Sequence, residues 1–249
     1  MSIKNPFFSP LAISHSNYHT LYTTKNPAPE LVPERIKEVS ALIQNFIVGQ
    51  KHPCLGAHSA VRGQAVRFGY YPQLASKEAT AGLSHDLYTY LQDRESINKP
   101  LASFMAVFDG PENLSELEFE TLLWDQLNAL KKVSDPLFEP DPKVSPNTEH
   151  GNFSYSFAGK AFYIVGMHPN SSRMARQFNK PMLIFNLHSQ FEWLRQRQSY
   201  EKLRSSIQAR DKALQGSINP MMEDFGSSSE ARQYSGRKVG AEWKCPIHH

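Results

Sequence analysis

The side chains best suited to chemistry lie in residues 166–176, directly after an apolar run that predicts a β-strand. His168 precedes Pro169, and a residue before proline favours an extended conformation, so the imidazole is expected at the end of that strand. Arg173 and Arg176 follow on one side of a predicted short helix. An imidazole can ligate iron, and guanidinium groups beside it can bind the carboxylates of an iron cofactor. The alternative is a plain strand-to-helix corner with solvated arginines.

A second imidazole, that of His188, stands at the end of the next predicted strand, residues 181–188. If the two strands are neighbours, His168 and His188 face one pocket, where they would form two iron ligands or a proximal and distal pair. The alternative for His188 is a hydrogen-bonded histidine at the margin of the sheet.

Carboxylates that could bind a cationic ligand follow in the last third of the chain. Asp211 and Asp224 lie close to a segment rich in Gly and Ser, and a carboxylate is the planar partner that a guanidinium prefers. Exposed acids on a loop are the alternative. Cys245 and His248 offer sulfur and nitrogen ligands that zinc accepts, although no second spaced pair accompanies them.

The composition is that of a folded protein: 40% of its 249 residues are hydrophobic, and 3 Trp, 10 Tyr and 15 Phe can build a core. The formal net charge is only +3 and no long basic block occurs, which argues against nucleic acid as a partner. No apolar run is long enough to cross a bilayer, and the first residues lack the pattern of a secretory signal. We therefore expect a cytoplasmic protein without a membrane partner, in which Cys54 and Cys245 are free thiols.

Apolar residues at helical spacing predict four long helices. They cover residues 33–49, 79–91, 115–130 and 190–214. Ser115 and Glu118 form a capping box at the start of the third helix, and the fourth is expected to break near Ser199. Ser171 or Ser172 is suited to cap the short helix that carries the two arginines.

Strand patterns and turns complete the predicted fold. The strands cover residues 65–71, 101–108, 153–157, 161–167 and 181–188, and the third and fourth form a hairpin. Residues 135–152 are expected to form a surface loop. No phosphate loop, dinucleotide motif or serine-hydrolase elbow is present. We predict an α+β fold with a small, largely antiparallel sheet packed with amphipathic helices, in a single domain over residues 1–249 whose irregular segment 215–249 folds back on the core.

Five blocks that occur in order along the chain together resemble the YqcI/YcgG family. They are GMHPNSSR at 166–173, FNLHSQFE at 185–192, RDKALQGSINP at 210–220, QYSGR at 233–237 and WKCP at 243–246. An ordered set of five blocks is far more specific than any one of them. The resemblance covers most of the chain and is strongest from about Phe153 onward, with PCLGA at 53–57 as the clearest similar stretch before it.

The resemblance implies an activity, because similar members include heme-dependent N-oxygenases that hydroxylate a guanidine or amine nitrogen of arginine-like amino acids in natural-product pathways. It implies heme b with a histidine ligand, O2 as co-substrate and an external electron donor, which would be an unidentified reductase. With that implication, we expect His168 to be the proximal iron ligand and His188 the second candidate. Arg173 and Arg176 are expected to pair with the heme propionates.

The same implied activity assigns the remaining residues to the substrate. Asp211 or Asp224 would hold the guanidinium, and Arg237 in the turn 233–237, beside Tyr234, would bind the carboxylate of the amino acid. A structural turn that pins the tail to the core explains residues 233–237 equally well. Two other hypotheses stay open: a heme-binding sensor or carrier without turnover, and a zinc protein that uses Cys245. A homodimer is compatible with the sequence.

Overall fold

The computed structural model describes residues 5–49, 52–221 and 226–247. These residues form a six-stranded sheet in the order β1-β2-β3-β6-β5-β4. The strands are β1 (His19–Thr20), β2 (Val66–Gln73), β3 (Ser103–Gly110), β4 (Tyr155–Phe157), β5 (Lys160–Met167) and β6 (Met182–Leu187). The pair β2–β3 is parallel and the other described pairs are antiparallel, which confirms the predicted fold class.

The helices agree with the predicted apolar spacing. They are α1 (Pro10–His15), α2 (Glu34–Gln44), α3 (Leu55–Arg62), α4 (Lys77–Asp93), α5 (Glu116–Ser134), α6 (His188–Gln196), α7 (Tyr200–Gln215) and α8 (Ala231–Tyr234). A π-helical turn, Asn45–Gly49, continues α2 to the predicted end. The capping box at α5 is confirmed, since Ser115 and Glu118 each accept a backbone hydrogen bond from the other. The break near Ser199 separates α6 from α7 as predicted. The sequence did not predict α1, α3, α8 or the short strand β1.

The short helix after β5 differs from the prediction. It is a single 3-10 turn, Met174–Arg176, and no side chain caps it. Ser172 is engaged elsewhere, because its hydroxyl donates to Glu116 at the start of α5 over 2.7 Å. Ser171 accepts the backbone N–H of Arg173 at 3.3 Å, which closes the loop before the turn. The predicted serine cap is therefore wrong, since both hydroxyls bind groups outside the helix.

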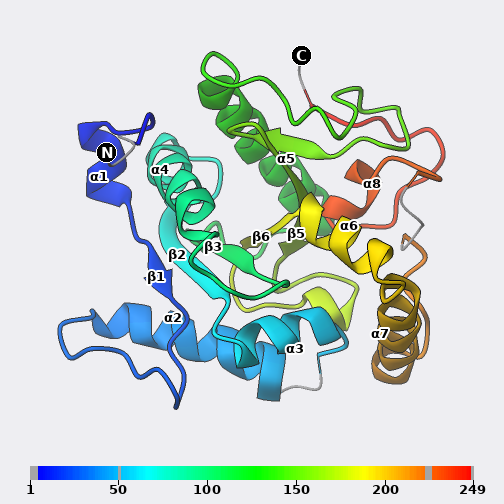
Figure 1. The fold of residues 1–249 in the computed structure, drawn as a ribbon, viewed down its shortest axis with the longest axis horizontal. Helices are drawn as coiled ribbons and strands as arrows, with labels where there is room; N and C mark the ends of the chain where they lie inside the picture. Colours follow the sequence, from blue (N-terminus) through cyan, green and yellow to red (C-terminus); the bar gives the residue numbers. More distant parts are fainter. Residues whose placement is uncertain (1–4, 50–51, 222–225, 248–249) are drawn as a thin grey trace.

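Side chains of β3 alternate between the two faces of the sheet, as the period of two in a strand requires. Phe104 and Phe108 pack in a core with α4 and α5, whereas Met105 and Val107 pack in a second core with α2 and α3. Figure 1 shows the two pairs of helices on opposite sides of the sheet. This alternation decides which residues of a strand can reach a site on either face.

The C-terminal residues 226–247 pack along the first of these cores. Ala231, Tyr234 and Ile247 are buried in it, and Trp243 and Cys245 lie against it. In the described part of the chain, no helix is both long and apolar enough to span a bilayer.

Candidate functional site

A cavity of about 270 Å³ lies on the face of the sheet that also carries α2 and α3. Its sheet wall contains Met105 of β3, Val165 of β5 and Ile184 of β6, and its helical walls come from α3, α6 and α7. These walls are mostly apolar, with a few polar groups between them. A concave apolar site with few polar groups is the usual form of a small-molecule site, so this cavity is the candidate functional site.

An imidazole and a thiol reach the cavity from the segment before α3. Cys54 is the N-cap of α3, and its Sγ accepts the backbone N–H of Ala57 at 3.4 Å. His52 Nε2 lies 3.1 Å from the carbonyl oxygen of Ala175, and its Nδ1 accepts the backbone N–H of Cys54 at 3.3 Å. Burial lowers the pKa of His52 to about 4 and raises the pKa of the Cys54 thiol. Both side chains are therefore neutral at pH 7 when nothing binds them.

This segment is held in place by α7, because the Arg210 guanidinium donates to the carbonyls of His52 and Pro53 at 3.0 and 3.2 Å. Sequence reasoning missed His52, although a signal existed. The His-Pro pair that singled out His168 occurs again at His52-Pro53, and of the two histidines it is His52 that lines the cavity.

Arg173 and Asp211, for which separate partners were predicted, bind one another at the cavity wall. Arg173 Nη2 donates to Asp211 Oδ2, and the same guanidinium donates to the hydroxyl and carbonyl of Ser217 at 3.0 and 2.9 Å. Asp211 Oδ2 also accepts the backbone N–H of Asn219 at 2.9 Å. A carboxylate neutralised in this way is a poor receptor for a second guanidinium, so the expected substrate role of Asp211 does not fit its surroundings.

Arg176 lines the cavity with no counter-charge beside it. Its guanidinium donates to three carbonyl oxygens, those of Gly166, Gln233 and Tyr234, over 2.9 to 3.0 Å. Among the described residues, no carboxylate oxygen lies within 4.0 Å of it. Burial lowers its pKa, although an arginine remains charged. A buried cation with only neutral partners is suited to an anionic group of a ligand.

The two predicted iron ligands, His168 and His188, do not share a pocket. Strands β5 and β6 are antiparallel, and Met167 pairs with Met182 while Phe162 pairs with Leu187. The two strand ends that precede the histidines, Met167 and Leu187, therefore lie at opposite ends of the pair, about 17 Å apart for five residues of register. The prediction of one shared pocket is wrong, because it required strand ends that meet, as in a parallel sheet.

Each of these histidines also has its own surroundings away from the centre of the cavity. His168 lies on the α5 face of the sheet, where its ring stacks on Phe119 with 4.4 Å between centroids. Burial lowers its pKa. His188 starts α6, with Nε2 3.3 Å from Glu192 Oε1 and Nδ1 3.8 Å from Glu230 Oε1. Glu230 is a cavity residue that the sequence did not single out.

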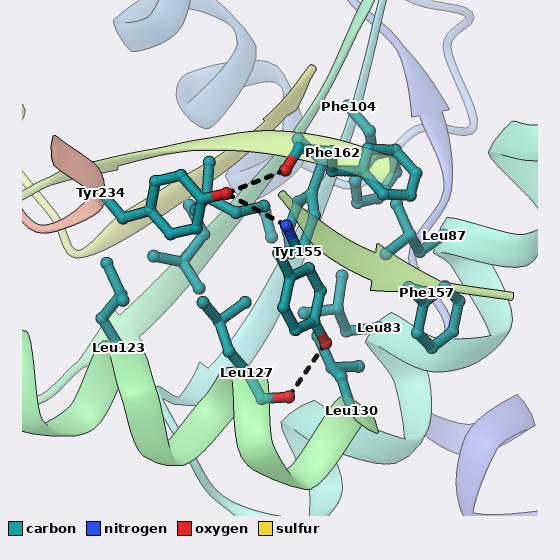
Figure 2. Packing of buried hydrophobic residues seen from close by; sticks show 14 of the residues in the cluster. Leu83, Leu87, Phe104, Leu123, Leu127, Leu130, Tyr155, Phe157, Phe162 and Tyr234 are labelled. Carbon is teal, nitrogen blue, oxygen red and sulfur yellow. Dashed lines mark hydrogen bonds between the residues drawn. The ribbon is translucent and has the colours of Figure 1, made fainter. Parts of the chain in front are cut away.

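The predicted carboxylate site around Tyr234 and Arg237 is a structural anchor. Tyr234 is fully buried, and Figure 2 shows its hydroxyl between the backbone N–H of Tyr155 and the carbonyl of Phe162. Arg237 donates to both oxygens of Glu120 on α5, at 2.6 and 2.9 Å. Neither side chain lines the cavity, so the alternative of a turn that pins the tail to the core describes them.

Two further candidates fall at the edge of what the structure describes. Asp224 and His248 lie outside the described residues. No group of three or more metal-ligating side chains occurs among residues 5–49, 52–221 and 226–247. Cys245 is half-buried beside the first core and is not among the residues that line the cavity.

Fold and site together define an α+β protein with an apolar cavity that carries a thiol, an imidazole and buried guanidinium groups on its wall. The chain belongs to the YqcI/YcgG family, whose model matches residues 43–248. The match includes every element that lines the cavity. No curated protein and no solved structure is similar enough to this chain to count as a match.

Proposed function

We propose that this protein binds heme b in the cavity and hydroxylates a guanidine or amine nitrogen of arginine or an arginine-like amino acid. Membership of the YqcI/YcgG family supports the proposal. The observation that carries it is the wall of the cavity, where Cys54, His52 and the buried Arg173 and Arg176 stand among mostly apolar side chains. When bound, heme would supply activation of O2 with electrons from an external donor.

The residues present fit heme in their chemistry. An apolar surface from β3, β5, β6, α6 and α7 suits the macrocycle, and buried cations suit its propionates. Arg176 has neutral partners only, and Arg173 has a buried Nε without a hydrogen-bond partner. These two arginines would therefore hold the propionates, as the sequence also predicted.

The axial ligand changes under this proposal, because His168 faces α5 and not the cavity. Cys54 is the donor that the geometry favours. Its sulfur accepts one backbone N–H, and the positive end of α3 stabilises a thiolate, which iron binding requires. His52 is the alternative axial ligand, but both of its ring nitrogens already have hydrogen-bond partners, and binding to iron would disturb one of these bonds.

Absorption spectra of the reconstituted protein test the cofactor. A wild-type protein that shows no Soret band after incubation with heme would refute the proposal. We expect Cys54→Ser to lose the long-wavelength ferrous carbonyl band of a thiolate complex, and Cys245→Ser to keep it as the matched control. If His52→Ala removes binding while Cys54→Ser does not, the imidazole is the ligand.

A separate assay tests turnover. Arginine and related guanidino acids, incubated with the heme-loaded protein, O2 and a reductant, should give a product heavier by one oxygen atom. Heme binding without any product across the panel would favour the alternative of a heme-binding sensor or carrier.

A further inference from the structure

Glu230 is a buried carboxyl group on the cavity wall, and none of the residues that the structure describes pairs it with a Lys or Arg side chain. It precedes α8 and is 5% exposed, and its Oε2 is buried without a hydrogen-bond partner. No Lys or Arg nitrogen of the described residues lies within 4.0 Å of it. His188 Nδ1 is 3.8 Å from Oε1, and burial lowers the pKa of His188. A neutral imidazole at this distance does not balance a carboxylate.

The groups that face Glu230 leave it mostly protonated. Burial is the largest influence and raises its pKa to about 8, and Glu192 on α6 acts in the same direction. Arg195 on α6 and the hydroxyls of Ser154 and Tyr234 lower the pKa by less. Both hydroxyls donate their hydrogen bonds to the carbonyl of Phe162, at 3.1 and 3.3 Å. Tyr163 on β5 is the remaining titratable neighbour, and it stays neutral because burial raises its pKa strongly.

Glu230 is also held rigidly. Arg176 donates to the carbonyls of Gln233 and Tyr234, which fixes α8 against β5 at the cavity wall. A receptor group on a fixed element is already oriented before a ligand arrives, and this saves ordering entropy on binding.

We propose that Glu230 is the specificity-determining residue that binds the cationic guanidinium or ammonium end of the ligand in this cavity, and that it gives up its proton to solvent as the cation binds. The inference rests on the proposed function, since it names the charge that the substrate must carry. The only bond that breaks is the O–H bond of the carboxylic acid, and a carboxylate–guanidinium pair replaces it. Asp211 cannot serve in its place, because Arg173 already neutralises it.

Calorimetric titration of the heme-loaded protein with arginine and with citrulline tests the inference. Citrulline has nearly the same shape but a neutral urea group. We expect wild type to prefer arginine by at least about tenfold, which is about 1.4 kcal/mol, and Glu230→Gln to lose that preference. Glu149→Gln, which removes an exposed loop carboxylate, is the matched control and should bind as wild type does.

Proton release is the readout that a merely structural role of Glu230 would not move. In buffers of different ionisation enthalpy, arginine binding to wild type at pH 7 should release close to one proton, whereas binding to Glu230→Gln should release none. With a pKa of about 8, the ionised fraction of Glu230 rises about eightfold between pH 7 and pH 8.5, so the arginine affinity of wild type should rise by the same factor.

Two results would overturn the inference: equal affinity of wild type for arginine and citrulline, or an unchanged preference in Glu230→Gln. Binding is measured without turnover, so the proposed function is judged separately. The protein could prefer arginine in a way that depends on Glu230 and yet form no oxidised product. That result would support the inference and contradict the proposed N-hydroxylase activity.

Discussion

Glu120 on α5 and Glu230 on the cavity wall are buried to nearly the same extent, at 4% and 5% exposure, yet their surroundings differ. Glu120 accepts hydrogen bonds from Arg237, Trp243 and Ser235. Burial raises the pKa of each carboxyl group. At Glu120 the hydrogen bonds outweigh burial and the pKa is lowered, whereas at Glu230 burial dominates.

The difference separates a polar cluster that stabilises the fold from a polar cluster that is suited to bind a charged ligand. Around Glu120 the C-terminal segment itself supplies the cation, so the ion pair fastens that segment to α5. Around the cavity, none of the described residues places a Lys or Arg nitrogen within 4.0 Å of Glu230 or a carboxylate oxygen within 4.0 Å of the Arg176 guanidinium. A buried guanidinium without an anion is unfavourable in the empty protein, and Glu230 avoids the same cost only by keeping its proton, so a ligand is the natural source of the missing charges.

Removal of the Glu120 charge should have the largest effect on stability. Glu120→Gln leaves the half-buried Arg237 without its carboxylate, and the loss of such charge-assisted hydrogen bonds typically lowers the free energy of unfolding by about 1.5–3 kcal/mol. Urea denaturation measures the loss, with Glu149→Gln as an exposed control. A change below about 1 kcal/mol would show that the Glu120 cluster contributes little to stability, and it would contradict the contrast with the cavity.

Neighbouring positions on β5 should respond differently to a change of volume. In Gly166→Ala the new Cβ would lie 2.7 Å from Leu123 Cδ1 and 2.9 Å from the backbone oxygen of Tyr234, and such overpacking lowers stability by about 1–3 kcal/mol. Val165→Ala faces the cavity and loses only part of a side chain that borders open space, at about 1 kcal/mol. Thermal unfolding of the two variants compares the α5 face of β5 with its cavity face. Equal losses of stability in the two variants would contradict the difference in packing between these faces.

The pH dependence of stability should distinguish the two carboxyl groups. The pKa of Glu230 is raised in the folded protein, so its contribution to stability is present below the unfolded pKa and is lost as the pH rises towards 8. Glu230→Gln should remove this loss, so its free energy of unfolding should rise relative to that of wild type between about pH 5 and pH 8. The pKa of Glu120 is lowered, so its contribution is lost as the pH falls. Parallel stability curves for Glu230→Gln and wild type would contradict this assignment.

Much of the fold was predictable because its signals are local. Three features occur where the sequence indicated, and each depends on a few adjacent residues. They are the capping box at Ser115, the hairpin of β4 and β5, and the break at Ser199. Helix α3 was missed, since its N-cap is a cysteine and not one of the residues that usually cap.

The site was predictable only in part. Arg173, Arg176 and Asp211 do reach the cavity, but their pairing depends on how η2 (Met174–Arg176) and α7 pack, which no local pattern encodes. His168 and His188 were both correctly placed at strand ends. Their separation follows from the antiparallel pairing of β5 with β6.

By itself, the sequence determined the long helices, five of the strands, the fold class and the family resemblance, because hydrophobic periodicity and caps act over a few residues. Only the tertiary structure decided that the His-Pro pair at the cavity is His52-Pro53, that Asp211 is already neutralised and that Glu230 is not. The physical reason is that burial and charge balance are set by residues far apart in the chain, which meet only when the sheet and its helices pack.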